Sequence, residues 1–146
     1  MKSAIILLFI ALPTYALNIG DCTQDWEGKV SACVTILSND LSCHKSYDKT
    51  HFDNCSVKTT FSLKGQYNDT ELTNAVADVK CSATILRKGS DNFEQFESVE
   101  REKSLMLTRT GSQTLSFYMD YNLFAYRPTS IKFRDSHCDI KNISTY

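Results

Sequence analysis

The stretch Leu115–Leu123, LSFYMDYNL, decides the fold class, because large apolar side chains occupy every second position in it. This period of two is typical of a half-buried β-strand. Residues 30–36, 56–63 and 79–85 repeat the alternation, and residues 131–133 offer a last short strand. These segments are rich in the β-branched and aromatic residues that favour extended structure. The apolar face of the first stretch comprises Leu115, Phe117, Met119, Tyr121 and Leu123.

Turn signals separate the expected strands. Glycine or proline occurs in Lys64-Gly65, in residues 88–92, in residues 110–112 and in Arg127-Pro128, and such positions punctuate regular structure. The spacing is typical of a meandering antiparallel sheet. The sequence therefore predicts a mainly β domain, either a single antiparallel sandwich or a small barrel, with room for one short helix.

Two segments also fit a helix. Apolar residues recur at helical spacing across residues 72–86, and Asn68 with Glu71 resembles a capping box. Asp91 with Glu94 would likewise begin a helix that runs through Val99. We expect one or two helical turns at residues 69–77 and a strand from Val79. The alternative is an α+β or helical disulfide-rich domain.

The first sixteen residues predict a secreted protein. Lys2 precedes an apolar run that ends at Leu12, and Ala16 provides a small-residue cleavage site, the pattern of a signal peptide. We expect residues 1–16 to be removed and residues 17–146 to form one extracellular domain. No later stretch approaches the roughly 20 apolar residues that a membrane-spanning helix needs.

The cysteine count agrees with an oxidising compartment. Six cysteines follow the expected cleavage site, and an even number in a secreted chain predicts three disulfides. We expect Cys43–Cys55 as a local loop, Cys33–Cys81 across the core and Cys22–Cys138 between the chain ends. Three N-glycosylation motifs, at Asn54, Asn68 and Asn142, point to the same compartment.

The histidines raise two further possibilities. His44 and His51 lie in or beside the loop between Cys43 and Cys55, but a zinc site would need both cysteines as thiolates, at a spacing unlike that of structural zinc sites. We therefore expect no metal and no cofactor. His44 or His51 together with His137 could supply the acid and base of a small secreted hydrolase, although the sequence contains no catalytic motif.

The aromatic stretch offers the best candidate for a binding surface. Its second face extends beyond Leu123 and contains both large aromatic and polar side chains, a mixture suited to a protein interface. Nucleic acid is not an expected partner, because 16 Lys and Arg residues are balanced by 17 Asp and Glu. We predict an extracellular binding module for a protein partner, with a carrier of lipid or another small hydrophobic ligand as the alternative. The candidate residues are Tyr118, Asp120, Asn122, Phe124 and Tyr126.

Overall fold

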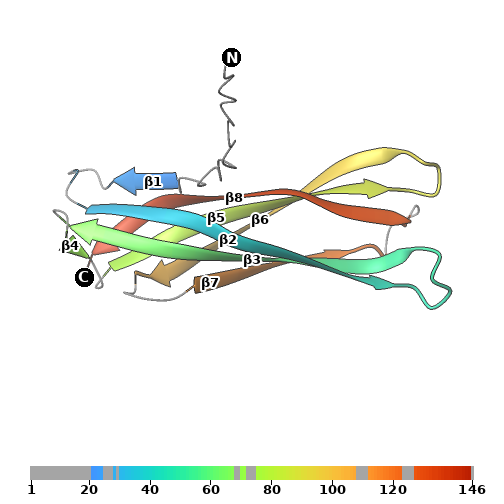
Figure 1. Ribbon diagram of the computed structural model, residues 1–146, viewed down its shortest axis with the longest axis horizontal. Coiled ribbons are helices and arrows are strands. Elements are labelled where there is room, and N and C mark those ends of the chain that lie inside the picture. The colour runs from blue at the N-terminus through green and yellow to red at the C-terminus, as the bar shows by residue number, and fades with distance from the viewer. Residues whose placement is uncertain are drawn as a thin grey trace, which may run out of the picture.

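The computed structural model describes residues 21–24, 28, 30–67, 70–71, 75–107, 112–122 and 127–145, which form two antiparallel sheets (Figure 1). Sheet A contains β1 (Asp21–Gln24), β2 (Val30–Lys45), β3 (Phe52–Tyr67), β4 (Thr70–Glu71) and β7 (Ser112–Asp120). Sheet B contains β6 (Glu94–Met106), β5 (Ala75–Lys88) and β8 (Ser130–Thr145), in that spatial order. The prediction of a mainly β fold with two antiparallel sheets is confirmed, and within these ranges the sheets do not close into a barrel.

Each sheet is organised around one central strand. In sheet A, β3 pairs with β2 on one side and with β7 and β4 on the other. In sheet B, β5 lies between β6 and β8. The sheets stack into an elongated sandwich in which β1 and β2 contact β8 along one side, while β7 contacts β6 along the other (Figure 1).

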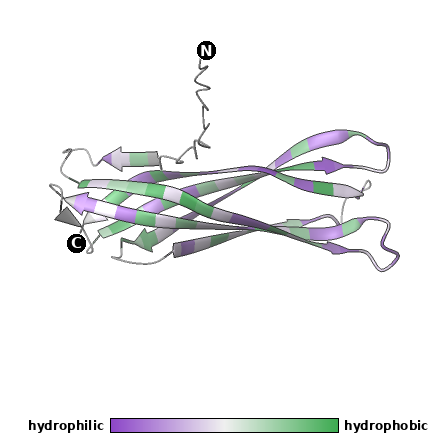
Figure 2. Ribbon diagram, in the orientation of Figure 1, coloured by the Kyte–Doolittle hydropathy of each residue, from purple (hydrophilic) through white to green (hydrophobic). Residues whose placement is uncertain are grey.

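The core fills the space between the inner faces of the two sheets. Apolar and polar residues alternate along much of the strands, as Figure 2 shows, and most of the apolar ones point inward. In residues 56–63 of β3 the alternate residues Val57, Thr59, Phe61 and Leu63 are all buried, as the sequence pattern predicts. The hydroxyl of the polar Thr59 donates to Asn39 Oδ1 at 2.7 Å. This bond satisfies a group that would otherwise lose its water without compensation. The largest fully buried side chains include Tyr121, Phe61, Phe117, Ile85 and Leu107.

Bulges interrupt the alternation in β2 and β8, and a further shift beside the β2–β3 turn leaves Asp53 of β3 without a partner on β2. The β2–β3 register shifts between Ile36 and Ser38, which leaves Leu37 without a partner on β3 and 57% exposed. One extra residue in a strand reverses whether the odd-numbered or the even-numbered side chains that follow it face the core. β8 contains two similar shifts, at Arg134 and Lys141. The bulges explain why the sequence pattern indicated only residues 30–36 of β2 and residues 131–133 of the much longer β8.

All three disulfides join directly opposed residues of neighbouring strands: Cys22–Cys33, Cys43–Cys55 and Cys81–Cys138, each with a Cα–Cα distance of 4.0 Å. The structure contains the expected loop disulfide, but the expected Cys33–Cys81 and Cys22–Cys138 pairings are wrong. Cys33 alternates with the inward-facing Ala32 and Val34 and so lies on the outer face of sheet A. Cys81 faces the core from sheet B, where Cys33 cannot reach it.

The helical turns expected at residues 69–77 and the competing helix from Asp91 are also wrong for the described residues, which exclude residues 69 and 72–74. β4 occupies Thr70–Glu71, and from Ala75 onward every second residue of β5 is buried, as a strand requires. Asp91 forms a turn instead of a helix cap, because its carboxylate accepts from Phe93 N at 3.0 Å. β6 then begins at Glu94. Gly65, expected in a turn, lies within β3 opposite Ala32.

The disulfides differ in how strongly they should stabilise the fold. Cys81 and Cys138 are 57 residues apart and Cys43 and Cys55 are 12 apart, so the chain-entropy model gives about 4 and about 3 kcal/mol respectively. We expect Cys81→Ala/Cys138→Ala to lower the free energy of unfolding more than Cys43→Ala/Cys55→Ala. Urea unfolding of both variants measures the difference. Equal losses would contradict the expected dependence on loop length.

Candidate functional site

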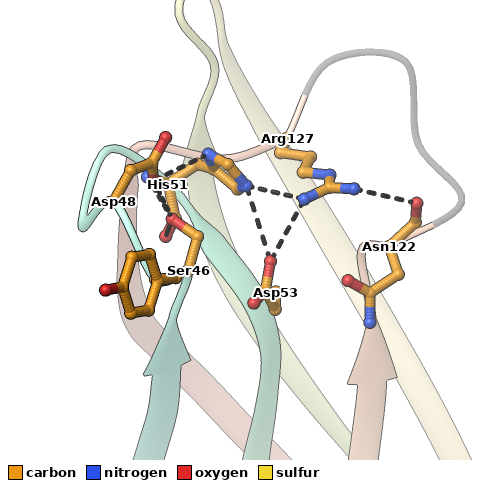
Figure 3. Close-up of a pocket in the computed structure, with 7 residues that line it drawn as sticks. Ser46, Asp48, His51, Asp53, Asn122 and Arg127 are labelled. Atoms are coloured by element: carbon orange, nitrogen blue, oxygen red, sulfur yellow. Dashed lines mark hydrogen bonds and ion pairs between the residues drawn. The ribbon is translucent and has the colours of Figure 1, made fainter.

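A polar pocket of about 380 Å³ lies at one end of the sandwich, where the β2–β3 turn meets the connection between β7 and β8 (Figure 3). Hydroxyl, carboxylate, imidazole, amide and guanidinium groups line it. Binding residues are often found on loops that a rigid sheet holds in place. The lining residues are Ser46, Tyr47, Asp48, His51, Asp53, Asn122 and Arg127.

The β2–β3 turn forms one wall of the pocket and is fixed by its own hydrogen bonds. Ser46 N donates to His51 O, and Lys49, at a positive φ of 60°, donates its N–H to Ser46 O. The Asp48 carboxylate accepts from Ser46 Oγ at 2.6 Å and from the backbone N and hydroxyl of Thr50. The bond from Ser46, followed by those from Thr50, lowers the pKa of Asp48 to about 2.

His51, Arg127 and Asp53 meet at the base of the pocket (Figure 3). Arg127 Nη1 lies 2.7 Å from His51 Nε2 and 3.2 Å from Asp53 Oδ1. A guanidinium group can only donate, so His51 Nε2 accepts this hydrogen bond and the ring proton resides on Nδ1. Nδ1 in turn lies 2.9 Å from Thr50 Oγ1. The His51 ring therefore lies between a guanidinium group and a hydroxyl group, with Asp53 Oδ1 3.5 Å from its Nε2.

The end of β7 anchors the opposite wall of the pocket. Tyr121 is fully buried, its N–H donates to Asp53 O at 2.8 Å, and its hydroxyl donates to Glu97 Oε2 of sheet B at 3.3 Å. Burial raises the pKa of the Tyr121 phenol, and the neighbouring Glu97 carboxylate raises it further. Because Tyr121 is held between the sheets, the adjoining Asn122 has a fixed position at the pocket rim.

The predicted surface residues are only partly described. Tyr118 and Asp120 are exposed on the outer face of β7, and Asn122 lines the pocket. The Asp120 carboxylate accepts from Asn122 N at 2.9 Å, which connects the strand to the pocket. Phe124 and Tyr126 lie outside the described residues. Their proposed part in a binding surface stays a prediction.

The three histidines do not come together. His44 Nδ1 lies 4.0 Å from Asp53 Oδ2, so two histidines border the same carboxylate as Arg127. His137 instead pairs with Ser82 in sheet B and contacts Asp139 Oδ1 at 2.6 Å. The Cys22–Cys138 disulfide that would have brought it near the N-terminal strands is not formed. The geometry gives no support to an acid–base pair that includes His137.

No group of three or more His, Cys, Asp or Glu side chains in the described part of the chain is placed to hold a metal ion. Cys43 and Cys55 are joined in a disulfide and offer no thiolate ligand. The same ranges contain no helix, and hence none with the length and apolarity to cross a membrane.

Sequence reasoning missed Arg127 as a site residue. The only local signal was its place before Pro128 in an expected turn. Its partners His51 and Asp53 are distant in sequence and meet it because Phe52 N donates to Pro128 O at 2.8 Å across the end of the sandwich.

A scan against protein-family models and searches of curated proteins and solved structures found no match.

The lowered pKa of Asp48 predicts a pH dependence of stability. A carboxyl whose pKa is lower in the folded state stabilises the fold above its ordinary pKa of 3.8, and this contribution is lost as the pH falls towards about 2. Asp48→Asn removes the titrating group. We expect the difference in unfolding free energy between the parent protein and Asp48→Asn to be constant above pH 5 and to shrink between pH 4 and pH 2. Urea unfolding across this range tests it, and parallel pH profiles would contradict it.

Proposed function

We propose that this protein is a secreted binding module that recognises an extracellular protein partner through the end of sheet A that carries the pocket. The proposed contact surface comprises Tyr118 and Asp120 of β7, Asn122, and the pocket formed by the β2–β3 turn and Arg127.

The observation that carries the proposal is an exposed tyrosine at the pocket rim together with a second exposed tyrosine on β7, the strand that leads to the pocket residue Asn122. Tyr118 is 59% exposed on a strand, and Tyr47 is fully exposed at the pocket rim. Tyrosine is enriched among the residues that dominate interface energetics, because it combines a large contact area with a hydroxyl group. An isolated exposed aromatic needs no explanation, but aromatics beside a polar pocket match the composition of a binding surface.

The scaffold beneath this surface favours binding without reorganisation. β7 pairs with β3 through its whole length, and β3 is joined to β2 by Cys43–Cys55 close to the turn. His51, Asp53 and Arg127 hold one another in place. A surface that is already ordered loses less conformational entropy when a partner binds.

The pocket chemistry favours a polar partner over a lipid. Asp48, Asp53 and Arg127 would each lose water to an acyl chain that offers them no hydrogen bonds, and such desolvation is costly. A protein partner can supply backbone and side-chain groups that satisfy them. We therefore rank a protein partner above a lipid or another hydrophobic ligand.

Secretion and glycosylation belong to the same proposal. Three disulfides fit an oxidising compartment. Asn142 is exposed on β8 and could carry a glycan, whereas Asn54 is half-buried between His44 and Asp120 in sheet A. Asn68 lies outside the described residues. We expect Asn142 to be modified more fully than Asn54.

Replacing Tyr118 tests the proposed surface. The tagged protein is first screened against an array of secreted proteins and cell-surface ectodomains, and each hit is measured by surface plasmon resonance. We expect Tyr118→Ala to weaken binding about 10- to 100-fold, the range for a hot-spot aromatic. The matched control is Phe96→Ala on the outer face of sheet B, where the side chain is 63% exposed. Equal affinities of both variants and the parent protein would disprove the surface, and an array without hits would count against a protein partner.

A further inference from the structure

The edge of β7 that faces away from β3 is a second feature of this strand, distinct from the proposed partner surface. β7 pairs with β3 from Ser112 to Asp120 in an unbroken register. No strand among the described residues pairs with its other edge, and the first part of β7 lies at the lower border of the sandwich in Figure 1. A strand edge of this kind presents backbone donors and acceptors that a further strand can pair with.

The Cys43–Cys55 disulfide beside the β2–β3 turn identifies which backbone groups of β7 point away from β3. Cys43 and Cys55 have Cα atoms 4.0 Å apart, the close spacing of a non-hydrogen-bonded pair, so Cys55 directs its N–H and C=O towards β7 and Met119. The bond from Tyr121 N to Asp53 O continues this alternation. The odd-numbered residues of β7 therefore bond to β3. The residues whose N–H and C=O groups face away from β3 are Ser112, Thr114, Ser116, Tyr118 and Asp120.

β7 lacks the features that protect an edge strand from pairing. The other strand with one partner at this side of the sandwich, β6, carries glutamates on its outer face, and Arg101 and Lys103 lie on its core-facing side. Charges that point inward on an edge strand discourage pairing. β7 contains no charged residue from Ser112 to Met119, no proline and no bulge against β3. From Ser112 to Met119, the sequence of β7 therefore contains nothing that would discourage a further strand from pairing with this edge.

We propose that β7 pairs with β7 of a second copy, antiparallel about a two-fold axis at Ser116, so that two A sheets become one continuous sheet. This register uses the whole strand and is self-complementary, as a two-fold interface requires. Thr114 would lie opposite Tyr118 of the second copy, a favourable aromatic–β-branched pair. Ser112 would face Asp120, and no like charges would be opposed. A β6–β6 pairing about Glu100 would instead bring two glutamates together.

The dimer would present two copies of the proposed partner surface. The side chain of Tyr118 lies on the outer face, perpendicular to the new backbone bonds, and so would stay accessible. A dimer could bind two copies of a partner or a partner that is itself dimeric, and the gain in avidity would come without new contacts. The dimer does not depend on the proposed function, because self-association is measured in the absence of a partner.

Opposite charges at the two-fold axis test the register. Sedimentation velocity on the purified full chain should give a concentration-dependent monomer–dimer equilibrium. We expect Ser116→Lys and Ser116→Asp each to weaken the dimer about tenfold or more, since like charges would lie directly opposed. An equimolar mixture of the two variants should restore it, which also shows that both are folded. The matched control, Ser98→Lys, places the same charge on the outer face of β6, an edge strand of sheet B, and should leave dimerisation unchanged.

Three results would overturn the inference. The first is a parent protein that stays monomeric at millimolar concentration. The second is an equal loss of dimer in Ser98→Lys and Ser116→Lys. The third is an equimolar mixture that stays as monomeric as each variant alone, because charge pairing would then not occur at Ser116. Each of these results would leave the Tyr118→Ala binding experiment unaffected, so the two proposals fail separately.

Discussion

Apolar contact between the two inner faces is the interaction on which this structure depends, because every disulfide joins strands of the same sheet. No covalent bond between described residues connects sheet A to sheet B apart from the chain itself. A few hydrogen bonds assist, such as that from Tyr121 to Glu97, but most of the contact is among aliphatic, aromatic and cystine side chains. The disulfides act within each sheet, where they fix strand register.

The molecule is polar at the end where the apolar contact between the two sheets stops. The inner apolar residues stop short of the β2–β3 turn, and there Asp53, His51 and Arg127 replace packing with hydrogen bonds and an ion pair. Tyr121 belongs to both regions, since its ring is buried in the core and its backbone N–H donates to Asp53 O. The position of the pocket therefore depends on how the core ends, and the pocket residues themselves are held by contacts between distant segments.

The sequence contained enough to predict the fold class but not its details. Period-two alternation identified residues 56–63 and 79–85 because β3 and β5 are regular and have one buried face there. It failed for most of β2 and β8, where bulges at Leu37, Arg134 and Lys141 reverse the parity, and for β6, which is mostly exposed. The pairing of Cys22 with Cys33 was missed because it depends on the short strand β1, which has no apolar pattern.

The candidate site was harder to predict than the strands. Asn122 was identified from the aromatic stretch that contains it, and His51 from its place in the loop between Cys43 and Cys55. Arg127 was not found, because only the folded chain brings it to His51. Contacts of this kind carry no local period, and single-sequence reasoning has no other means of finding them.

The position of Cys43–Cys55 just behind the turn affects how the molecule would respond to a protease. Tyr47 and Lys49 are exposed between the two cysteines, in a tip of the kind that proteases cut first. A single cut there would leave both new ends attached to the same cystine, and β2 and β3 would keep their hydrogen bonds behind it. The nicked chain would retain its mass on a non-reducing gel and would separate into two fragments after reduction.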